Sequence, residues 1–425
     1  MSHFQYQNGV LHADSVALPA IAEQFGTPTY VYSKSALLEN FRAYSDACKG
    51  RDALVCYAMK ANSNLAILDL LNREGAGFDI VSGGELLRVI AAGGDPGKTI
   101  FSGVGKTVEE MQLALENGIL CFNVESIPEL HRLNEVAGSM GKRAPVSLRV
   151  NPNVDAKTHP YIATGLKANK FGVAFDDALD TYRTAASLPN LDVVGIDCHI
   201  GSQLLDDAPL LAALEKLIEL IDTLAGEGIV LHHLDIGGGL GVNYGAEGDK
   251  PPVPVGDYLG RLFARIDAWR AEKYEGKPVK VIFEPGRSIV ADTGVLLTKI
   301  EYLKPGVEKN FAIVDAAMND LMRPTLYQAW MGVQPVSPRE GAKLTYDVVG
   351  PVCESGDWLA RERDLAVEPG DLLAIMTAGA YGMTMASNYN TRGRAAEVIV
   401  DGDQVHVIRQ RENPADLFAL ESMLK

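Results

Sequence analysis

The most constraining feature of this chain is a regular alternation of short apolar runs with stretches of helical periodicity. Eight runs of four to seven residues read as buried strands, because they are short and rich in apolar side chains. They lie at residues 54–59, 78–81, 99–102, 119–124, 146–150, 193–199, 231–236 and 280–283. The stretch 210–224, between two of these runs, repeats leucine and isoleucine every three or four residues and indicates a helix that ends at Gly226.

Eight strand–helix units between residues 54 and 283 fit a (β/α)₈ barrel, a fold that takes about 250 residues. An open doubly wound sheet is the alternative, but evenly spaced units without a switch-point signature favour closure. After residue 286 the pattern becomes mainly β, with strand-like runs at 295–303, 311–315, 343–349, 371–376 and 395–407. We therefore expect an α/β chain with a TIM-like (β/α)₈ barrel at residues 30–285. Residues 286–425, with N-terminal residues 1–29, form a second, mainly β domain.

Charge and cysteine content limit the classes of partner and compartment. A formal net charge of −16 argues against nucleic acid or anionic membranes as partners. The five cysteines contain no CxxC pair, which suits free thiols in a reducing compartment. The first ten residues lack a signal-peptide pattern, and charged residues interrupt the longest apolar stretch, 210–231. We expect a soluble, cytoplasmic protein.

Polar and glycine-rich sequences follow the predicted barrel strands, at the end where barrels place their catalytic groups. Each has an ordinary explanation by itself, but their repetition at one rim is hard to explain as packing. They are Lys60, Asp79 to Ser82, Arg149 to Pro152, His199 to Ser202, Gly237 to Gly241 and Glu284 to Arg287.

The glycine run Gly237-Gly238-Gly239 removes side chains that would keep an anion away from the backbone. Such a run is often only a tight turn, but barrels frequently bind phosphate with the loops after strands seven and eight, where this run and Arg287 lie. The run lacks the last glycine of GxGxxG, and Ser102 to Thr107 resembles a P-loop without its first glycine. No histidine or cysteine spacing predicts a metal site.

Lys60 ends the first predicted barrel strand and can be read in two ways. It is an ordinary lysine that extends to solvent, or a partly desolvated amine that forms a Schiff base. A strand-end lysine together with a phosphate cradle favours pyridoxal phosphate (PLP). Glu284 would then keep the pyridine nitrogen protonated. His199 would stack on the ring or be a hydrogen-bonded core histidine.

Six motifs give the chain a resemblance to a known family. Residues 57–62, 199–202, 237–241 and 284–287 resemble the fold-type III PLP decarboxylases, in which an alanine-racemase-like barrel is joined to a β domain. Residues 322–327 and 350–355 narrow the resemblance to the diaminopimelate decarboxylase family. The match runs in order from Tyr30 to Tyr389. Thr325, Trp330 and Met331 depart from residues common in relatives, so we expect this pocket wall to differ.

The resemblance implies roles for residues of the cofactor site. Lys60 would be the catalytic Schiff-base lysine, Glu284 would face the pyridinium nitrogen and His199 the ring. The remaining implied cofactor contacts are Asp79, Ser202, Gly237, Gly238, Gly239, Gly286, Arg287 and Tyr381.

The resemblance also implies a substrate site for meso-diaminopimelate, which has two amines and two carboxylates. Arg287, Arg323 and Tyr327 would bind the carboxylate that is kept, and Glu354 would pair with the distal ammonium. Cys353 would be catalytic and deliver a proton to Cα. Tyr381 would contact both substrate and cofactor, while Cys353 and Glu354 would come from the partner subunit of a homodimer.

The implied reaction converts meso-diaminopimelate to L-lysine and CO₂, the last step of lysine biosynthesis. Ornithine or arginine decarboxylation is the nearest alternative, but those substrates lack the distal carboxylate that Arg323 would bind. A racemase would use a weaker electron sink than Glu284 allows. A non-catalytic PLP carrier would not need Cys353. Residues 153–172 are either a lid or a solvated loop.

Overall fold

The computed structural model describes residues 3–155, 169–246, 250–274 and 279–424 and divides into two compact units. The barrel unit comprises Phe41–Val242 and Pro251–Ser288. The β unit comprises Met1–Asn40, Asn243–Lys250 and Ile289–Lys425. Most of the segment predicted as a lid or loop, 153–172, lies outside the described residues. Within the described part of the chain, no helix has the length and apolar character needed to cross a bilayer.

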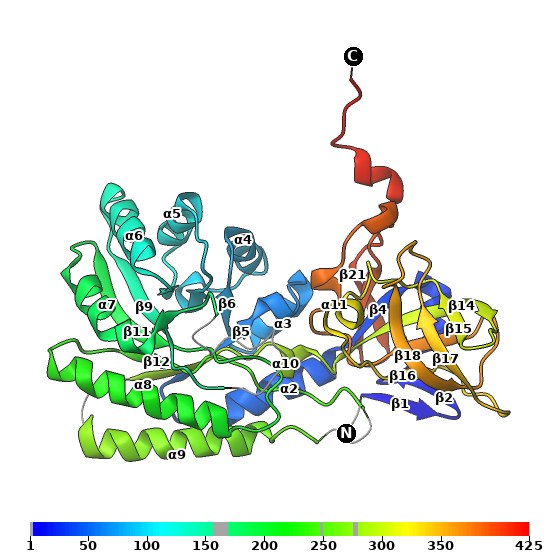
Figure 1. Cartoon of the computed structure of the whole chain (residues 1–425), viewed down its shortest axis with the longest axis horizontal. Helices are drawn as coiled ribbons and strands as arrows, with labels where there is room; N and C mark the ends of the chain where they lie inside the picture. Colours follow the sequence, from blue (N-terminus) through cyan, green and yellow to red (C-terminus); the bar gives the residue numbers. More distant parts are fainter. Residues whose placement is uncertain (1–2, 156–168, 247–249, 275–278, 425) are drawn as a thin grey trace. The chain divides into compact units, whose positions relative to one another are not determined.

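The barrel unit contains a closed barrel of eight parallel strands, as the sequence predicts (Figure 1). Closure follows from two pairings, because β13 pairs with β5 at one junction and β8 pairs with β9 at the other. The short strand β10 (Val173–Ala174) adds to β9 outside the ring. The barrel strands are β5 (Ala53–Ala58), β6 (Gly77–Ile80), β7 (Thr99–Phe101), β8 (Cys121–Val124), β9 (Ala144–Asn151), β11 (Leu191–Asp197), β12 (His233–Asp235) and β13 (Lys280–Phe283).

Amphipathic helices connect these strands, and α4 to α7 follow one another around the barrel in Figure 1. Helix α5 shows the local signals clearly, because Thr107 and Glu110 form a capping box at its start and Gly118 ends it with φ +65°. The helices are α2 (Lys34–Ala47), α3 (Leu65–Arg73), α4 (Gly83–Ala91), α5 (Val108–Asn117), α6 (Ile127–Ser139), α7 (Phe175–Ser187), α8 (Ala208–Gly226) and α9 (Val255–Lys273), with short 3₁₀ turns η1 (Met59–Ala61) and η2 (Pro96–Lys98).

The interior of the barrel changes from apolar to charged along its axis. Near the amino ends of the strands, Cys56, Ile100, Cys121 and Ile282 form a buried apolar cluster. Two residues further along a strand the side chain faces the same way. Ile282 is therefore followed by Glu284, and Cys121 by Asn123, towards the carboxyl ends. The apolar layer supports the barrel and the polar layer forms the rim.

The β unit is built on a second sheet in the order β18-β17-β15-β14-β4-β20-β21, with β19 pairing to both β14 and β16. Its core includes Leu18, Val31, Leu297 and Val398, all fully buried. The strands are β4 (Thr29–Ser33), β14 (Gly294–Lys304), β15 (Asn310–Val314), β16 (Val333–Pro335), β17 (Leu344–Val349), β18 (Trp358–Leu365), β19 (Leu372–Ile375), β20 (Ala396–Asp401) and β21 (Gln404–Arg409).

Smaller elements complete the β unit. The sheet β1 (Phe4–Gln7), β2 (Val10–Ala13) and β3 (Val16–Ala17) precedes helix α1 (Leu18–Phe25). The short helices are α10 (Arg287–Val290), α11 (Arg323–Tyr327), η3 (Met383–Met385), η4 (Tyr389–Thr391) and η5 (Pro414–Phe418).

The unit boundaries differ from the expected ones at the N-terminal side. The expected boundary between residues 29 and 30 lies inside β4, which pairs with β14 and β20 of the second sheet. The strand around Tyr30 thus joins the sheet of the second unit, and only the position of the boundary differs. The other expected boundary, between 285 and 286, lies close to the division after Ser288, and Asn243–Lys250 also belongs to the β unit.

Candidate active site

Lys60 lies at the barrel rim, held by a buried acid. Its ammonium group on η1 donates to Asp79 Oδ2 at 2.7 Å, and Asp79 at the end of β6 has no solvent exposure. The register pairs Asp79 with Ala58, two residues before Lys60. The lysine is therefore fixed on a rigid element by a charge-assisted hydrogen bond rather than extended freely into solvent.

The glycine run after β12 is packed tightly against neighbouring strand ends. A Cβ atom at Gly238 would lie 2.1 Å from the Glu284 carbonyl oxygen, and one at Gly237 would lie 2.3 Å from that of Cys198. Gly237 also has φ +66°, which favours glycine. No larger residue fits at these two positions without movement of the backbone.

The amides of this run are partly occupied by side chains. The Gly237 amide donates to Asp235 Oδ1 at 2.8 Å, and the Gly238 amide donates to His199 Nδ1 at 3.2 Å. These two bonds fix the turn from inside the barrel. Donors for an anion are therefore expected from Gly239, Ser202 and Arg287, since the amides of Gly237 and Gly238 already have acceptors.

Arg287 and Ser202 form the cationic part of this rim. Arg287 Nε and Nη2 lie 3.2 and 3.1 Å from Ser202 Oγ, and the arginine is buried. The loop that carries Ser202 is joined to the glycine run, because the Leu204 amide donates to the Gly239 carbonyl at 2.9 Å. A guanidinium and a hydroxyl beside a glycine turn are suitable donors for a phosphate.

His199 is a neutral, oriented imidazole. Burial lowers its pKa well below 6.5, and the positive charges of Arg149 and Lys60 lower it further. Because Nδ1 accepts the hydrogen bond from Gly238, the ring proton belongs on Nε2. This bond agrees with the expectation of a hydrogen-bonded histidine, whereas stacking of His199 on a cofactor ring stays a prediction.

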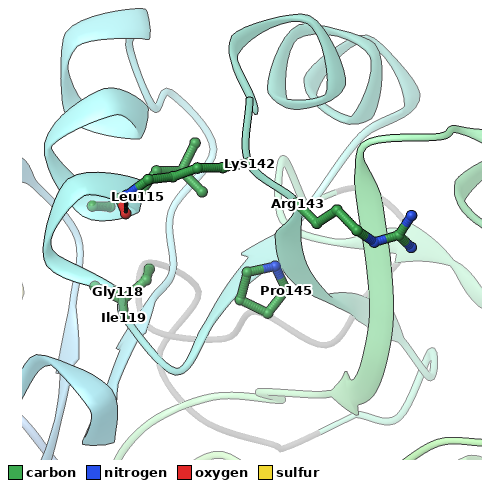
Figure 2. Close-up of a pocket in the computed structure, with 7 residues that line it drawn as sticks. Leu115, Gly118, Ile119, Lys142, Arg143 and Pro145 are labelled. Atoms are coloured by element: carbon green, nitrogen blue, oxygen red, sulfur yellow. Dashed lines mark hydrogen bonds between the residues drawn. The ribbon is translucent and has the colours of Figure 1, made fainter. Parts of the chain in front are cut away.

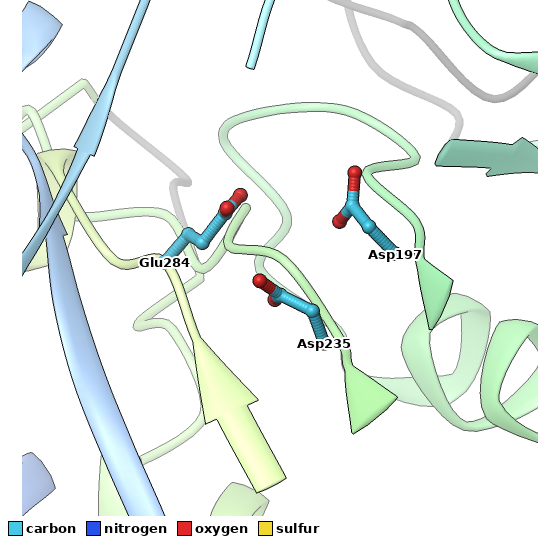
Figure 3. Close-up of side chains that lie close together, drawn as sticks. All are labelled: Asp197, Asp235 and Glu284. Carbon is cyan, nitrogen blue, oxygen red and sulfur yellow. The ribbon is translucent and has the colours of Figure 1, made fainter. Parts of the chain in front are cut away.

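Three buried carboxyl groups meet at the ends of adjacent strands. Figure 3 shows Asp197, Asp235 and Glu284, which follow or end β11, β12 and β13 and point towards one another. One oxygen from each lies within 4.8 Å of the others, and we call this set the acid cluster. Asp197 Oδ1, Asp235 Oδ2 and Glu284 Oε1 are buried and have no hydrogen-bond partner among the described residues.

Burial and mutual repulsion keep protons on the acid cluster. Burial and the charges of Asp235 and Asp79 raise the pKa of Glu284 well above its ordinary value. Burial likewise raises the pKa of Asp235 to about 7. Arg149 partly compensates on one side, because its Nε lies 4.0 Å from Asp197 and its Nη1 lies 3.5 Å from Glu125.

Sequence reasoning did not single out Asp197, Asp235 or Glu125. The first two are acids at the last position of a barrel strand, although each strand contains another polar residue, Asp192 in β11 and His233 in β12. Asp197 and Asp235 lie two residues before His199 and Gly237, so strand alternation predicts that they face the barrel interior.

Apart from Arg287 at the barrel rim, the expected substrate-binding residues lie in the β unit, where Arg323 is the most constrained. It begins α11, is buried, and its Nη1 donates to Met331 Sδ at 3.2 Å. Its guanidinium carbon lies 4.3 Å from the centre of the Tyr244 ring, a cation–π contact. Tyr327 follows at the end of the same helix and is half-buried. Met331, one of the departures from relatives, is thus in direct contact with Arg323.

Cys353 and Glu354 are exposed on a turn that lies beside α11. The turn is closed by Asp357, which accepts from the Val352 amide at 2.7 Å. Thr325 on α11 donates to the Gly356 carbonyl at 2.6 Å. Cys353 is the exposed cysteine, whereas Cys48, Cys56, Cys121 and Cys198 are buried. Tyr381 is half-buried in the same unit, with φ +55°.

The barrel rim fits PLP in three respects. The buried Glu284 Oε1 has no hydrogen-bond partner among the described residues, so it is available to accept a hydrogen bond from a ring N–H. The glycine turn carries no side chain that would keep an anion away from its backbone. The Ser202–Arg287 pair supplies donors for a phosphate, and Lys60 supplies the amine.

A separate pocket of about 190 Å³ lies at the opposite, amino end of the barrel strands (Figure 2). Its two cations are already used, because Lys142 donates to the Leu115 carbonyl and Arg143 to the carbonyls of Pro189 and Leu191. Pro145, near the start of β9, marks its position. This pocket is therefore distinct from the rim that carries Lys60.

The chain is similar in sequence and in structure to known PLP-dependent decarboxylases. Residues 34–291 match the family model described as the pyridoxal-dependent decarboxylase, pyridoxal binding domain. A diaminopimelate decarboxylase of Pseudomonas aeruginosa is 60% identical over 424 residues, and one of Pseudomonas fluorescens is 59% identical over 425, each covering 100% of both chains. The crystal structure of diaminopimelate decarboxylase from M. jannaschii in complex with L-lysine is 38% identical, covers 99% of this chain and 98% of its own, and has a TM-score of 0.93.

Proposed function

Because this chain belongs to the diaminopimelate decarboxylase family of pyridoxal-dependent decarboxylases, we propose that it converts meso-diaminopimelate to L-lysine and CO₂. One observation carries the proposal. The carboxyl ends of a single closed barrel bring together the Lys60–Asp79 pair, the glycine turn and the buried acid Glu284. An amine, an anion site and a ring-nitrogen partner are the three parts that PLP chemistry requires.

The proposal assigns the cofactor to residues of the barrel rim. PLP, when bound, supplies an electron sink for the electron pair left at Cα when the carboxylate departs. Lys60 holds the cofactor covalently and Glu284 keeps the proton on the ring nitrogen. Ser202, Arg287 and the glycine turn hold the phosphate. The neutral His199 covers the ring without adding a positive charge beside it.

The proposal assigns substrate selection to the β unit. Arg323, with Tyr327 and with Arg287 of the barrel rim, holds the distal carboxylate, and the Tyr244 contact and the Met331 bond keep its guanidinium in place. Glu354 pairs with the distal ammonium group. The neighbouring Cys353 thiol delivers a proton to the α-carbon after CO₂ has left, as a general acid can. Tyr381 contacts both ligands.

A homodimer with shared active sites is part of this proposal, with Cys353 and Glu354 supplied by the partner. A mixing experiment tests it. Lys60→Ala and Cys353→Ala chains, each inactive alone, are expected to regain about a quarter of wild-type activity after dissociation and random reassociation, because half of the dimers are mixed and each has one intact site. Recovery of no activity by mixed dimers would contradict shared sites and leave the chemistry intact.

A cytoplasmic location completes the proposal. Four buried free thiols and one exposed thiol suit a compartment that keeps cysteines reduced.

The direct test measures CO₂ release from meso-diaminopimelate, ornithine and arginine by the PLP-loaded protein. We expect release from diaminopimelate alone, together with a Schiff-base absorbance that Lys60→Ala abolishes. Arg323→Met should keep that absorbance and lower kcat/KM for diaminopimelate by at least about a hundredfold, since a buried arginine–carboxylate pair is lost. Release from ornithine or arginine would overturn the substrate, and no Schiff base in wild type would overturn the whole proposal.

A further inference from the structure

The acid cluster contains more buried acid than one ring-nitrogen partner requires. Glu284 alone would serve that role, yet Asp235 and Asp197 place two further carboxyl groups within 4.8 Å of it. All three side chains are almost fully buried. Three ionised carboxylates at this spacing and depth would repel one another strongly, so the arrangement has to be neutralised by protons or by a cation.

Among the residues that the structure describes, the charges that face the cluster do not balance it. The acids Asp79 and Glu125 add to the three of the cluster, against two cations, Lys60 and Arg149. Lys60 is already paired with Asp79, and Arg149 lies beside Asp197 and Glu125. The other titratable groups that the described residues place around the cluster are neutral His199 and groups whose pKa burial raises: the thiols of Cys56, Cys121 and Cys198 and the phenols of Tyr182 and Tyr258.

Asp235 connects the cluster to the glycine turn. Its Oδ1 accepts the Gly237 amide at 2.8 Å, whereas its Oδ2 is buried without a partner among the described residues. The amide bond favours the ionised form of Asp235, and an ionised Asp235 favours a proton on the adjacent Glu284. The geometry therefore assigns the proton of the cluster to Glu284.

We propose that Asp235 is a positioning residue that keeps Glu284 protonated in the cofactor-free protein, so that Glu284 hands this proton to the ring nitrogen when PLP binds. The inference rests on the proposed function. In this step the O–H bond of Glu284 breaks and an N–H bond forms at the ring nitrogen, whose lone pair accepts the proton. Glu284 would become a carboxylate paired with the new pyridinium, with no proton exchanged with solvent, when PLP arrives with an unprotonated ring nitrogen. When PLP arrives already as the pyridinium, the same proton of Glu284 would be released to solvent.

Infrared difference spectroscopy on the wild-type chain tests whether Glu284 is protonated before PLP binds and loses its proton when PLP binds. The PLP-free protein at pH 7.5 should show the carbonyl band of a protonated, buried carboxyl group, and addition of PLP should reduce it. The Glu284→Gln variant should lose the PLP-dependent change. Absence of the band in PLP-free wild type, or no change on PLP addition, overturns the inference. An ionised cluster that holds a metal cation instead would give the first of these results.

Proton uptake tests the role of Asp235. Asp235→Asn keeps an oxygen for the Gly237 amide but removes the negative charge, so Glu284 ionises more easily and the proton for the ring has to come from solvent. Binding of PLP at pH 8 should then take up about one proton more per chain than in wild type. Around pH 8, the dissociation constant of PLP from Asp235→Asn should rise about tenfold per pH unit relative to that from wild type. Equal uptake in wild type and Asp235→Asn overturns the inference.

A matched control separates this effect from the loss of any buried carboxylate. Asp207 is buried, paired with Arg261 at 2.6 Å, and does not belong to the acid cluster. Asp207→Asn should not measurably change the proton uptake that accompanies PLP binding. A wild-type chain that forms no Schiff base with PLP refutes the proposed function, whereas a wild type that binds PLP and shows no infrared change refutes only the role of the cluster. The infrared result decides the matter if Asp235→Asn does not fold.

Discussion

Replacement of His233 by glutamine should make the barrel unit less sensitive to acid. His233 faces the barrel interior from β12, where its Nε2 lies 3.8 Å from Cys121 Sγ. Burial lowers its pKa from 6.5 to about 4, and the charges of His232 and Lys280 contribute in the same direction. The imidazole is thus neutral in the folded barrel under conditions where the unfolded chain is already protonated.

The sign and size of the effect follow from proton linkage. Below pH 6.5 the unfolded chain binds a proton at His233 that the folded chain does not, so the free energy of unfolding decreases as the pH falls. The loss is complete near pH 4 and amounts to about 3 kcal/mol, of which about 2.5 kcal/mol is present by pH 4.5. The buried acids act in the opposite direction, so only a comparison of variants isolates this contribution.

Urea unfolding at a series of pH values measures this contribution of His233 to the free energy of unfolding. Trp330→Phe and Trp358→Phe leave Trp269, buried in α9, as the single tryptophan and reporter of the barrel unit. Between pH 7.5 and 4.5 the free energy of unfolding should fall by about 2.5 kcal/mol less in His233→Gln than in this background. His232→Gln, which removes only one of the two charges that lower the pKa of His233, should change this fall in the same direction but by a smaller amount. A difference below about 1 kcal/mol for His233→Gln would refute the buried neutral imidazole.

Three further predictions follow from packing and exposure in each unit. Gly195→Ala should destabilise the barrel unit by about 2 kcal/mol in urea, because its Cβ would lie 1.9 Å from His233 Nε2, whereas Gly256→Ala, with open space around it, should not. Lys106→Met should lower the free energy of unfolding by about 3 kcal/mol, because it leaves Glu129 buried without its 2.7 Å partner. Adding Glu129→Gln should recover more than half of this loss, and equal stability of the single and double variants would contradict the prediction. A thiol reagent should modify one cysteine rapidly in the folded chain, and mass spectrometry should place it at Cys353; rapid labelling of two or more would contradict the burial of the others.

Much of the barrel was predictable because its signals are local. Each of the eight predicted apolar runs overlaps one of the observed barrel strands, and strand-end polarity placed Lys60 and Glu284 at one rim. The prediction of the β unit was less complete. Strand β18 was not predicted, because Arg361, Glu362 and Arg363 interrupt its apolar pattern and Glu362 has φ +59°. Its place in the sheet depends on pairing with β17, which the sequence of β18 does not reveal.

The rest of the site depends on register between strands. Asp197 and Asp235 become partners of Glu284 only because β11, β12 and β13 pair in parallel and end at the same level. Two of the three glycine amides are occupied by Asp235 and His199, which spacing along the chain cannot show. The roles of Arg323, Cys353 and Glu354 came from resemblance and stay part of the proposal.

The two loops at the anion site are joined as one piece. Gln203 exchanges hydrogen bonds with the backbone of Val242 at 2.6 and 3.2 Å, and Leu204 exchanges backbone bonds with Gly239 and Gly241. Loops held in this way have already lost most of their conformational freedom before a ligand arrives. A phosphate that binds there meets a preorganised receptor, so less of its binding energy is lost to ordering the protein.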